Sequence, residues 1–214
     1  RTVTNLPVSV ICDNQAAKII SSRDPSINII DKICTDNDID RRPGSYIKCF
    51  KPKLNAFGHL PYNTNVVIDC DCFFNKSFEH LISDDYDIGY CKETNYSMDD
   101  PNRPWDHNPY ISNLNSGFII INKNKEWFKL LNAAVKLYYD YETGIKTLPW
   151  WGNDLRTLTD QRALGMAILQ SHTLTYMVFP GLWNVRRPNV NRVDGEIYML
   201  HSRFDKDGNP RNTT

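Results

Sequence analysis

The sequence predicts an α/β fold in which a mostly parallel sheet is flanked by helices, and two observations support this. Short β-branched apolar segments alternate with segments of helical periodicity along the chain, which is typical of α/β folds. The 214 residues, of which 41% are hydrophobic, suffice for one core of ordinary size. We therefore expect a single domain over residues 1–206, with the polar residues 207–214 as a tail or linker.

Runs of Val, Ile, Tyr and Phe bounded by turn residues predict the strands. These runs cover residues 6–13, 27–30, 45–50, 64–71, 86–91, 116–122, 173–180 and 196–202. Apolar residues at helical spacing predict helices over 14–22, 76–82, 125–141 and 159–170. The clearest stripe comprises Trp127, Leu130, Leu131, Ala134 and Tyr138. Thr159 is placed to cap the helix that follows it.

One predicted strand ends in two aspartates that are separated by a single residue. The apolar residues 66–68 lead into Asp69, Cys70 and Asp71. On a strand the two carboxylates share one face, and Cys70 points the other way, with Cys72, towards the core. Adjacent like charges repel, and a divalent cation relieves the repulsion. The pair is therefore a candidate metal site, and the alternative is an acidic strand end exposed to water.

Polar side chains also follow the first and last predicted strands, namely Asp13, Asn14 and His201. Sites in open α/β sheets lie at the carboxyl ends of the strands. We therefore expect these residues to converge on Asp69 and Asp71.

Charge and cysteine usage restrict the function classes. Lys and Arg total 25 and so do Asp and Glu, so no overall field favours nucleic acid. No segment has the run of about 20 apolar residues that a membrane span needs, and no signal peptide is visible. The six cysteines form no CxxC pair, and we expect reduced thiols in a cytoplasmic protein.

Two long segments, 92–113 and 143–157, contain prolines and several aromatic residues but show no regular periodicity. Loops of this length in a compact domain are usually functional or disordered. Aromatic rings stack on the apolar faces of sugars, so we expect loops that cover a substrate; plain surface packing is the alternative.

Taken in order, these motifs resemble those of the GT-A glycosyltransferases, which have a Rossmann-like, mostly parallel central sheet and a metal-binding D-x-D motif. The segment closest to that motif is "VVIDCDCFF", and four others are similar to segments of the glycogenin-like retaining group. These are residues 113–122, 159–164, 180–185 and 200–202, the last containing the family's metal-binding His. A closer resemblance is to the domains with which large chlorella viruses build capsid glycans, which would place the protein in the host cytoplasm.

The resemblance implies a metal-dependent enzyme that transfers a hexose-type sugar from a UDP-sugar to a glycan or glycoprotein acceptor, with retention. Mn²⁺ or Mg²⁺ would stabilise the charge on the departing UDP. The implied ligands are Asp69, Asp71 and His201, and an imidazole ligand favours Mn²⁺. Without the resemblance, His201 is a strand-end histidine that bonds to backbone.

The resemblance also assigns residues to the donor. Asp13 and Asn14 would lie near the base and ribose; Lys53 and Cys70 near the donor; Asn115, Ser116 and Gly117 at the sugar; Asp160 and Gln161 at its reacting carbon; and Arg203 or Lys206 at the diphosphate. The structural alternatives are a helix cap at Asn14, a solvated Lys53, a tight turn at Gly117 and a favourable helix-dipole contact for Asp160. The family's Gly and Pro-Trp after the metal-binding His are absent, which leaves the choice between Arg203 and Lys206 open.

Two other classes compete with this assignment. HAD-type phosphohydrolases also end a strand in D-x-D, with the first Asp, here Asp69, as nucleophile. They place Thr or Val two residues after the second Asp, where this chain has Phe73. A non-catalytic module that binds sugar nucleotides or glycans is the third possibility.

Overall fold

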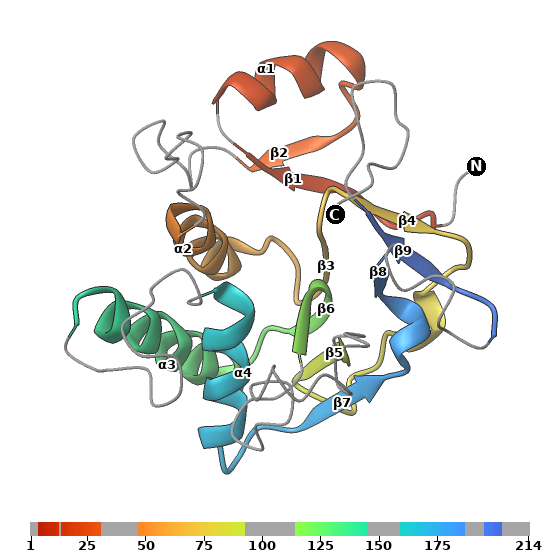
Figure 1. Ribbon diagram of the computed structural model, residues 1–214. Helices are drawn as coiled ribbons and strands as arrows, with labels where there is room; N and C mark the ends of the chain where they lie inside the picture. Colours follow the sequence, from red (N-terminus) through yellow and green to blue (C-terminus); the bar gives the residue numbers. More distant parts are fainter. Residues whose placement is uncertain are drawn as a thin grey trace.

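The computed structural model describes residues 4–12, 14–30, 47–92, 114–144, 159–186 and 195–202, and these form a mixed α/β fold (Figure 1). The helices are α1 (Asn14–Arg23), α2 (Ile47–Ala56), α3 (Lys125–Glu142) and α4 (Asp160–Gln170), with 3-10 turns η1 (Phe57–His59), η2 (Glu79–Leu81) and η6 (Gly181–Trp183). The strands are β1 (Ser9–Ile11), β2 (Asn28–Ile30), β3 (Thr64–Ile68), β4 (Cys72–Phe74), β5 (Ile88–Lys92), β6 (Leu114–Asn122), β7 (Tyr176–Phe179), β8 (Val185–Arg186) and β9 (Met199–His201). None of these helices is long and apolar enough to cross a membrane.

The described strands form three sheets. The central sheet has the order β3-β6-β5-β7, the second has the order β4-β9-β8, and β1 pairs with β2. β6 runs antiparallel to both β3 and β5, whereas β5 and β7 are parallel. The α/β class is therefore confirmed, but the sheet is mixed rather than mostly parallel, because its central strand is reversed relative to its neighbours.

β6 is buried on both faces and separates two cores. Ile119 and Ile121 point into a cluster with α2, α3 and α4, while Phe118 and Ile120 point into a cluster that includes Trp183. The alternation follows from the two-residue period of a strand. In Figure 1 the three helices lie on one side of this sheet and β4, β9 and β8 lie on the other. An apolar run with both faces covered is the pattern expected of a central strand.

The long helices agree with their predicted positions and caps. All five residues of the predicted α3 stripe are at most 6% exposed. The side chain of Asn124 caps α3 by accepting hydrogen bonds from Glu126 N and Trp127 N. Thr159 caps α4 as expected, accepting from Arg162 N.

One predicted strand, 45–50, is wrong, because Ile47–Ala56 is helix α2. The alternation of apolar and polar residues there favoured a strand. In the structure Leu54 and Phe57 are buried in the core with α3, and the ring of Phe57 meets Trp127 edge-on with centroids 6.1 Å apart. The three-residue spacing of Leu54 and Phe57 places both on one face only in a helix, and this packing outweighs local β propensity.

Several expectations lie outside the described residues. These concern nearly all of the two aromatic loops, 92–113 and 143–157, and the tail after residue 206. Cys70, Cys72 and Cys91 are free thiols as predicted. Cys72 packs against the second core, but Cys70 is exposed, which contradicts its expected core-facing position. Cys70 lies in a turn and not on a strand, so the two-residue alternation of side chains does not apply to it.

Candidate functional site

Asp69 and Asp71 lie in the turn that links β3 to β4, just beyond the strand on which they were predicted. Three backbone hydrogen bonds hold this turn. Asp69 N donates to Gly117 O at 3.0 Å, Cys72 N donates to Asp69 O at 3.2 Å, and Ser202 N donates to Asp71 O at 2.9 Å. The turn is thus attached to β6 on one side and to the end of β9 on the other.

The imidazole of His201 faces both carboxylates. Its Nε2 lies 3.2 Å from Asp71 Oδ1 and 3.8 Å from Asp69 Oδ2. Its other nitrogen, Nδ1, lies 3.0 Å from Asn184 Oδ1. An amide oxygen can only accept, so Nδ1 carries the hydrogen and Nε2 is directed towards the aspartates. Nε2 is therefore the ring nitrogen that can reach a cation held by the two carboxylates.

Gly117 makes room for this imidazole. A Cβ at position 117 would lie 2.7 Å from both Cε1 and Nδ1 of His201, and 3.1 Å from Asn115 Oδ1. Real Cβ atoms do not approach that closely, so no larger side chain fits while the ring keeps its position. Asn115 fixes the backbone of Gly117, because its side-chain Oδ1 accepts a hydrogen bond from Gly117 N at 2.8 Å.

Lys53 joins the carboxylate turn to a second acidic residue. From α2 its Nζ donates to Asp69 Oδ1 at 2.6 Å, and it lies 3.3 Å from Asp160 Oδ2 at the start of α4. The same ammonium donates to the carbonyl and the hydroxyl of Ser116, both at 3.1 Å. Lys53 therefore touches three elements of the site.

The charges around Lys53 are unequally exposed. The side chain of Asp160 is 3% exposed, while those of Asp69 and Asp71 are 28% and 31% exposed. Burial lowers the pKa of Lys53, but the carboxylates of Asp160 and Asp69 more than offset this, so its pKa is raised and it stays charged. The positive end of α4 further stabilises the buried carboxylate of Asp160.

Gln161 belongs to the same network. Its Oε1 accepts from Ser116 N at 3.2 Å, which attaches the start of α4 to β6. Thr159 caps this helix, so α4 begins at a fixed residue and presents Asp160 and Gln161 together towards β6.

The structure thus brings together nine of the predicted site residues: Lys53, Asp69, Asp71, Asn115, Ser116, Gly117, Asp160, Gln161 and His201. Cys70 lies in the same turn between the aspartates. Asp13, Arg203, Lys206 and the side chain of Asn14 lie outside the described part of the chain, and so does any contact they make.

Two features of the site were not predicted. Asn184 lies in the segment 180–185 that carried part of the resemblance, but that resemblance assigned it no role. Its completely buried side chain orients His201. The ion pair between Lys53 and Asp160 joins residues more than 100 positions apart, and no local sequence pattern signals it. The residues that contact His201 and Lys53 can be read in the sequence, but the sequence does not show which of them contacts which.

The residues fit a divalent metal ion by the chemistry of their donor atoms. Two carboxylates and one imidazole, whose Nε2 faces them, supply the oxygen and nitrogen ligands that Mn²⁺ accepts. The hydrogen bond from Nδ1 to Asn184 is the kind of outer contact that metal-binding histidines make. These residues could therefore hold the cation that the sequence implied.

No protein-family model matches the chain, and no curated protein matches it by sequence. Among solved structures, the chain is similar to mouse xyloside xylosyltransferase 1 at 11% identity, over 96% of this chain and 86% of that one, with a TM-score of 0.53.

Two further sugar transferases are similarly close in fold. The galactosyltransferase LgtC, solved with donor and acceptor sugar analogues, shares 11% identity over 92% of this chain and 86% of that one, with a TM-score of 0.51. The glycosyltransferase GlyE of Streptococcus pneumoniae shares 12% identity over 92% of this chain and 48% of that one, with a TM-score of 0.53. The chain therefore has the GT-A fold of the glycosyltransferases, as the motifs in its sequence implied.

Proposed function

We propose that this protein is a metal-dependent glycosyltransferase that uses a UDP-sugar as donor and a glycan or glycoprotein as acceptor. The observation that carries the proposal is the position of His201 Nε2, on β9, at 3.2 Å from Asp71 Oδ1 and 3.8 Å from Asp69 Oδ2, both in the β3–β4 turn. In a GT-A fold this is a site at which a cation and a nucleoside diphosphate can meet.

The metal-binding role falls to Asp69, Asp71 and His201, and Mn²⁺ is the favoured ion. When bound, such an ion supplies Lewis-acid stabilisation of the charge that develops on a departing diphosphate. The carboxylates are about 30% exposed, so a donor can reach them from solvent. Lys53 adds a positive charge beside Asp69, which offsets part of the negative charge of the site and so favours an anionic donor.

Asp160 and Gln161 are proposed to face the reacting carbon of the sugar. Asp160 is buried and ion-paired, and besides that ion pair its Oδ2 has no hydrogen-bond partner among the described residues. A fixed, shielded carboxylate is suited to stabilising positive charge on a sugar ring, which is an electrostatic role. A general base would instead need contact with the acceptor hydroxyl.

We propose that the reaction retains the donor's anomeric configuration, because the chain resembles the retaining group in the segments that carry Asp160 and Gly117. If Asp160 acts electrostatically, Asp160→Asn should slow transfer by about two to three decades, corresponding to roughly 3–4 kcal/mol, while donor binding changes little. A sole nucleophile would cost far more.

The competing functions differ in their products. The GT-A fold argues against a HAD-type phosphohydrolase, and the ammonium of Lys53 at 2.6 Å engages the carboxylate that would be the nucleophile. The decisive experiment incubates the protein with UDP-sugars, Mn²⁺ and a panel of glycan acceptors. Transfer with retention, read by NMR of the product, supports the proposal; phosphate release identifies a hydrolase, and binding without turnover identifies a binding module.

The origin of the chain and the roles of its loops stay predictions. The resemblance to viral capsid-glycan enzymes motivates capsid-type glycans in the acceptor panel. If Trp150 and Trp151 cover the donor, replacing both with Ala should raise the ratio of hydrolysis to transfer, because closed sites exclude water.

A further inference from the structure

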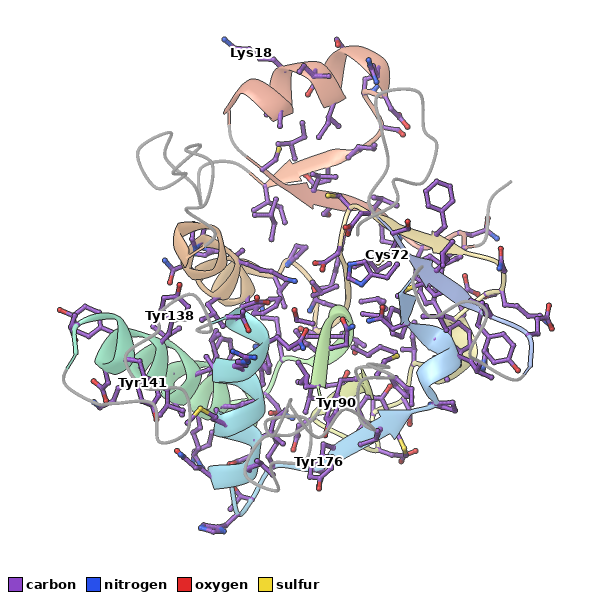
Figure 2. All side chains as sticks on the ribbon, in the orientation of Figure 1. Lys18, Cys72, Tyr90, Tyr138, Tyr141 and Tyr176 are labelled. Atoms are coloured by element: carbon purple, nitrogen blue, oxygen red, sulfur yellow. The ribbon has the colours of Figure 1, made fainter. Side chains whose placement is uncertain are left out.

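A thiol lies beside the proposed metal ligands. One ligand atom from each of Asp71, Cys72 and His201 lies within 4.8 Å of the other two. The arrangement is built into the second sheet, because Cys72 is the cross-strand partner of His201 in the antiparallel β4–β9 pair. Figure 2 labels Cys72 near the junction of β4, β9 and the end of β3. The thiol donates a weak hydrogen bond to Gly117 O at 3.6 Å.

Two of these three residues already have the spacing of a tetrahedral ion site, and the third lies close to it. Zn–N and Zn–O bonds of about 2.0 Å at the tetrahedral angle separate two ligand atoms by about 3.3 Å. His201 Nε2 and Asp71 Oδ1 are already 3.2 Å apart. The Cys72 sulfur lies within 4.8 Å of a ligand atom of Asp71 and of one of His201. A Zn–S bond of about 2.3 Å places the sulfur about 3.5 Å from the other ligand atoms, so the approach still needed is on the order of an ångström. Asn184 holds the imidazole so that Nε2 faces this point.

The ligand types favour a thiophilic ion. A hard ion such as Mn²⁺ is served by carboxylates and an imidazole and has no need of sulfur, whereas Zn²⁺ binds thiolate and imidazole tightly. We propose that Asp71, Cys72 and His201 form a binding site for Zn²⁺ or a similar thiophilic divalent ion, which overlaps the proposed manganese site. Binding replaces the thiol proton with the metal, so one proton is released for each ion bound.

Occupation by Zn²⁺ should block donor binding. The two sites share Asp71 and His201, so they exclude each other. A four-coordinate ion with three protein ligands keeps one open position, whereas an ion that bridges both phosphates of a donor needs two. An octahedral ion held by three protein ligands keeps three. This blocking effect rests on the proposed function, but the Zn²⁺ site itself does not.

The site is tested with Co²⁺ as a spectroscopic substitute for Zn²⁺, on the whole chain kept reduced by a thiol-free reductant. Co²⁺ should produce a thiolate-to-cobalt charge-transfer band in the near ultraviolet, and one equivalent of Zn²⁺ should remove it. Cys72→Ser should abolish the band and weaken Zn²⁺ binding by at least about tenfold. Cys70→Ser is the matched control, because Cys70 is the exposed thiol two residues away, and it should keep the band.

Each outcome bears on the proposal without requiring sugar transfer. Cobalt bound without a charge-transfer band, a band that survives Cys72→Ser, or a band lost in Cys70→Ser would each overturn the Zn²⁺ site. The blocking effect is read separately by calorimetry of UDP in Mn²⁺, with and without one equivalent of Zn²⁺. UDP affinity should fall at least tenfold in the wild type and much less in Cys72→Ser; equal losses in both would refute the role of Cys72. If UDP does not bind in Mn²⁺ at all, the proposed function fails while the cobalt result still stands.

Discussion

Gly117→Ala tests whether the position of His201 matters for metal-dependent donor binding. The new Cβ would lie 2.7 Å from the imidazole, whereas ordinary contacts begin at 3.4 Å, so the ring must retreat by about 0.7 Å. Metal–ligand distances tolerate deviations of only about 0.2 Å. A ring displaced by that amount therefore cannot keep its bond to the ion.

The expected effect is large enough to measure by calorimetry. Loss of correct ligand orientation weakens metal sites by about 10- to 100-fold, which is about 1.4–2.7 kcal/mol. We expect the affinity for UDP in Mn²⁺ to fall within this range. In a His201→Ala background the alanine at 117 has no ring to displace, so the same substitution should change the residual affinity little. The two substitutions are thus expected to be non-additive.

Two other glycines serve as controls. A Cβ at Gly89 would lie 2.4 Å from Phe179 in the second core, so Gly89→Ala should lower the melting temperature without weakening UDP binding by the folded protein. A Cβ at Gly58 would meet only Leu131, at 3.8 Å, so Gly58→Ala should be nearly neutral. Wild-type UDP affinity in folded Gly117→Ala would refute the reasoning, as would a full additional loss in the His201→Ala background.

Three further predictions follow from other contacts. Asn184→Leu should weaken UDP binding in Mn²⁺ by about 10- to 100-fold, and Asn184→Asp, which keeps an acceptor for His201 Nδ1, should restore most of it; equal losses would contradict the orienting role. Thr159→Ala should cost about 1 kcal/mol in chemical denaturation by removing the α4 cap, and an unchanged midpoint would count against that cap. Burial raises the pKa of Asp87, but hydrogen bonds led by that from Thr175 N more than offset it, so the pKa lies below 3.8. The stability that the charged Asp87 carboxylate contributes is therefore present above pH 3.8 and is lost as the pH falls further. Asp87→Asn should thus be less stable than the wild type at neutral pH and equally stable in strong acid.

The sequence predicted those parts of the fold that a local period determines. The α3 stripe and the apolar run of β6 each have a clear period and a length typical of their class, and both were placed within two residues. The segment 45–50 failed because its helical face is defined by Leu54 and Phe57, which pack against a helix 70 residues away. The direction of β6 was also beyond prediction, because a buried run is equally apolar in a parallel or an antiparallel sheet.

The candidate site was predictable in its members but not in its connections. Asp69 and Asp71 were recognisable from their spacing after a buried strand, although they lie in a turn and not on the strand. The contact of Lys53 with Asp160 depends on how α2 and α4 pack, and the proximity of Cys72 to His201 depends on the β4–β9 register. Both contacts arise from the tertiary structure, so no motif along the chain predicts them.

The most direct test of the central claim is nucleotide release from a panel of UDP-, GDP- and CMP-sugars, measured with and without Mn²⁺. The account predicts release from one or more UDP-sugars, dependent on Mn²⁺ and stimulated by an acceptor. It also predicts that release is lost in the folded Asp69→Asn, Asp71→Asn double variant, which keeps the shape of both side chains but removes their charge. Undiminished, metal-independent release by that variant would contradict the claim that these two carboxylates hold the ion.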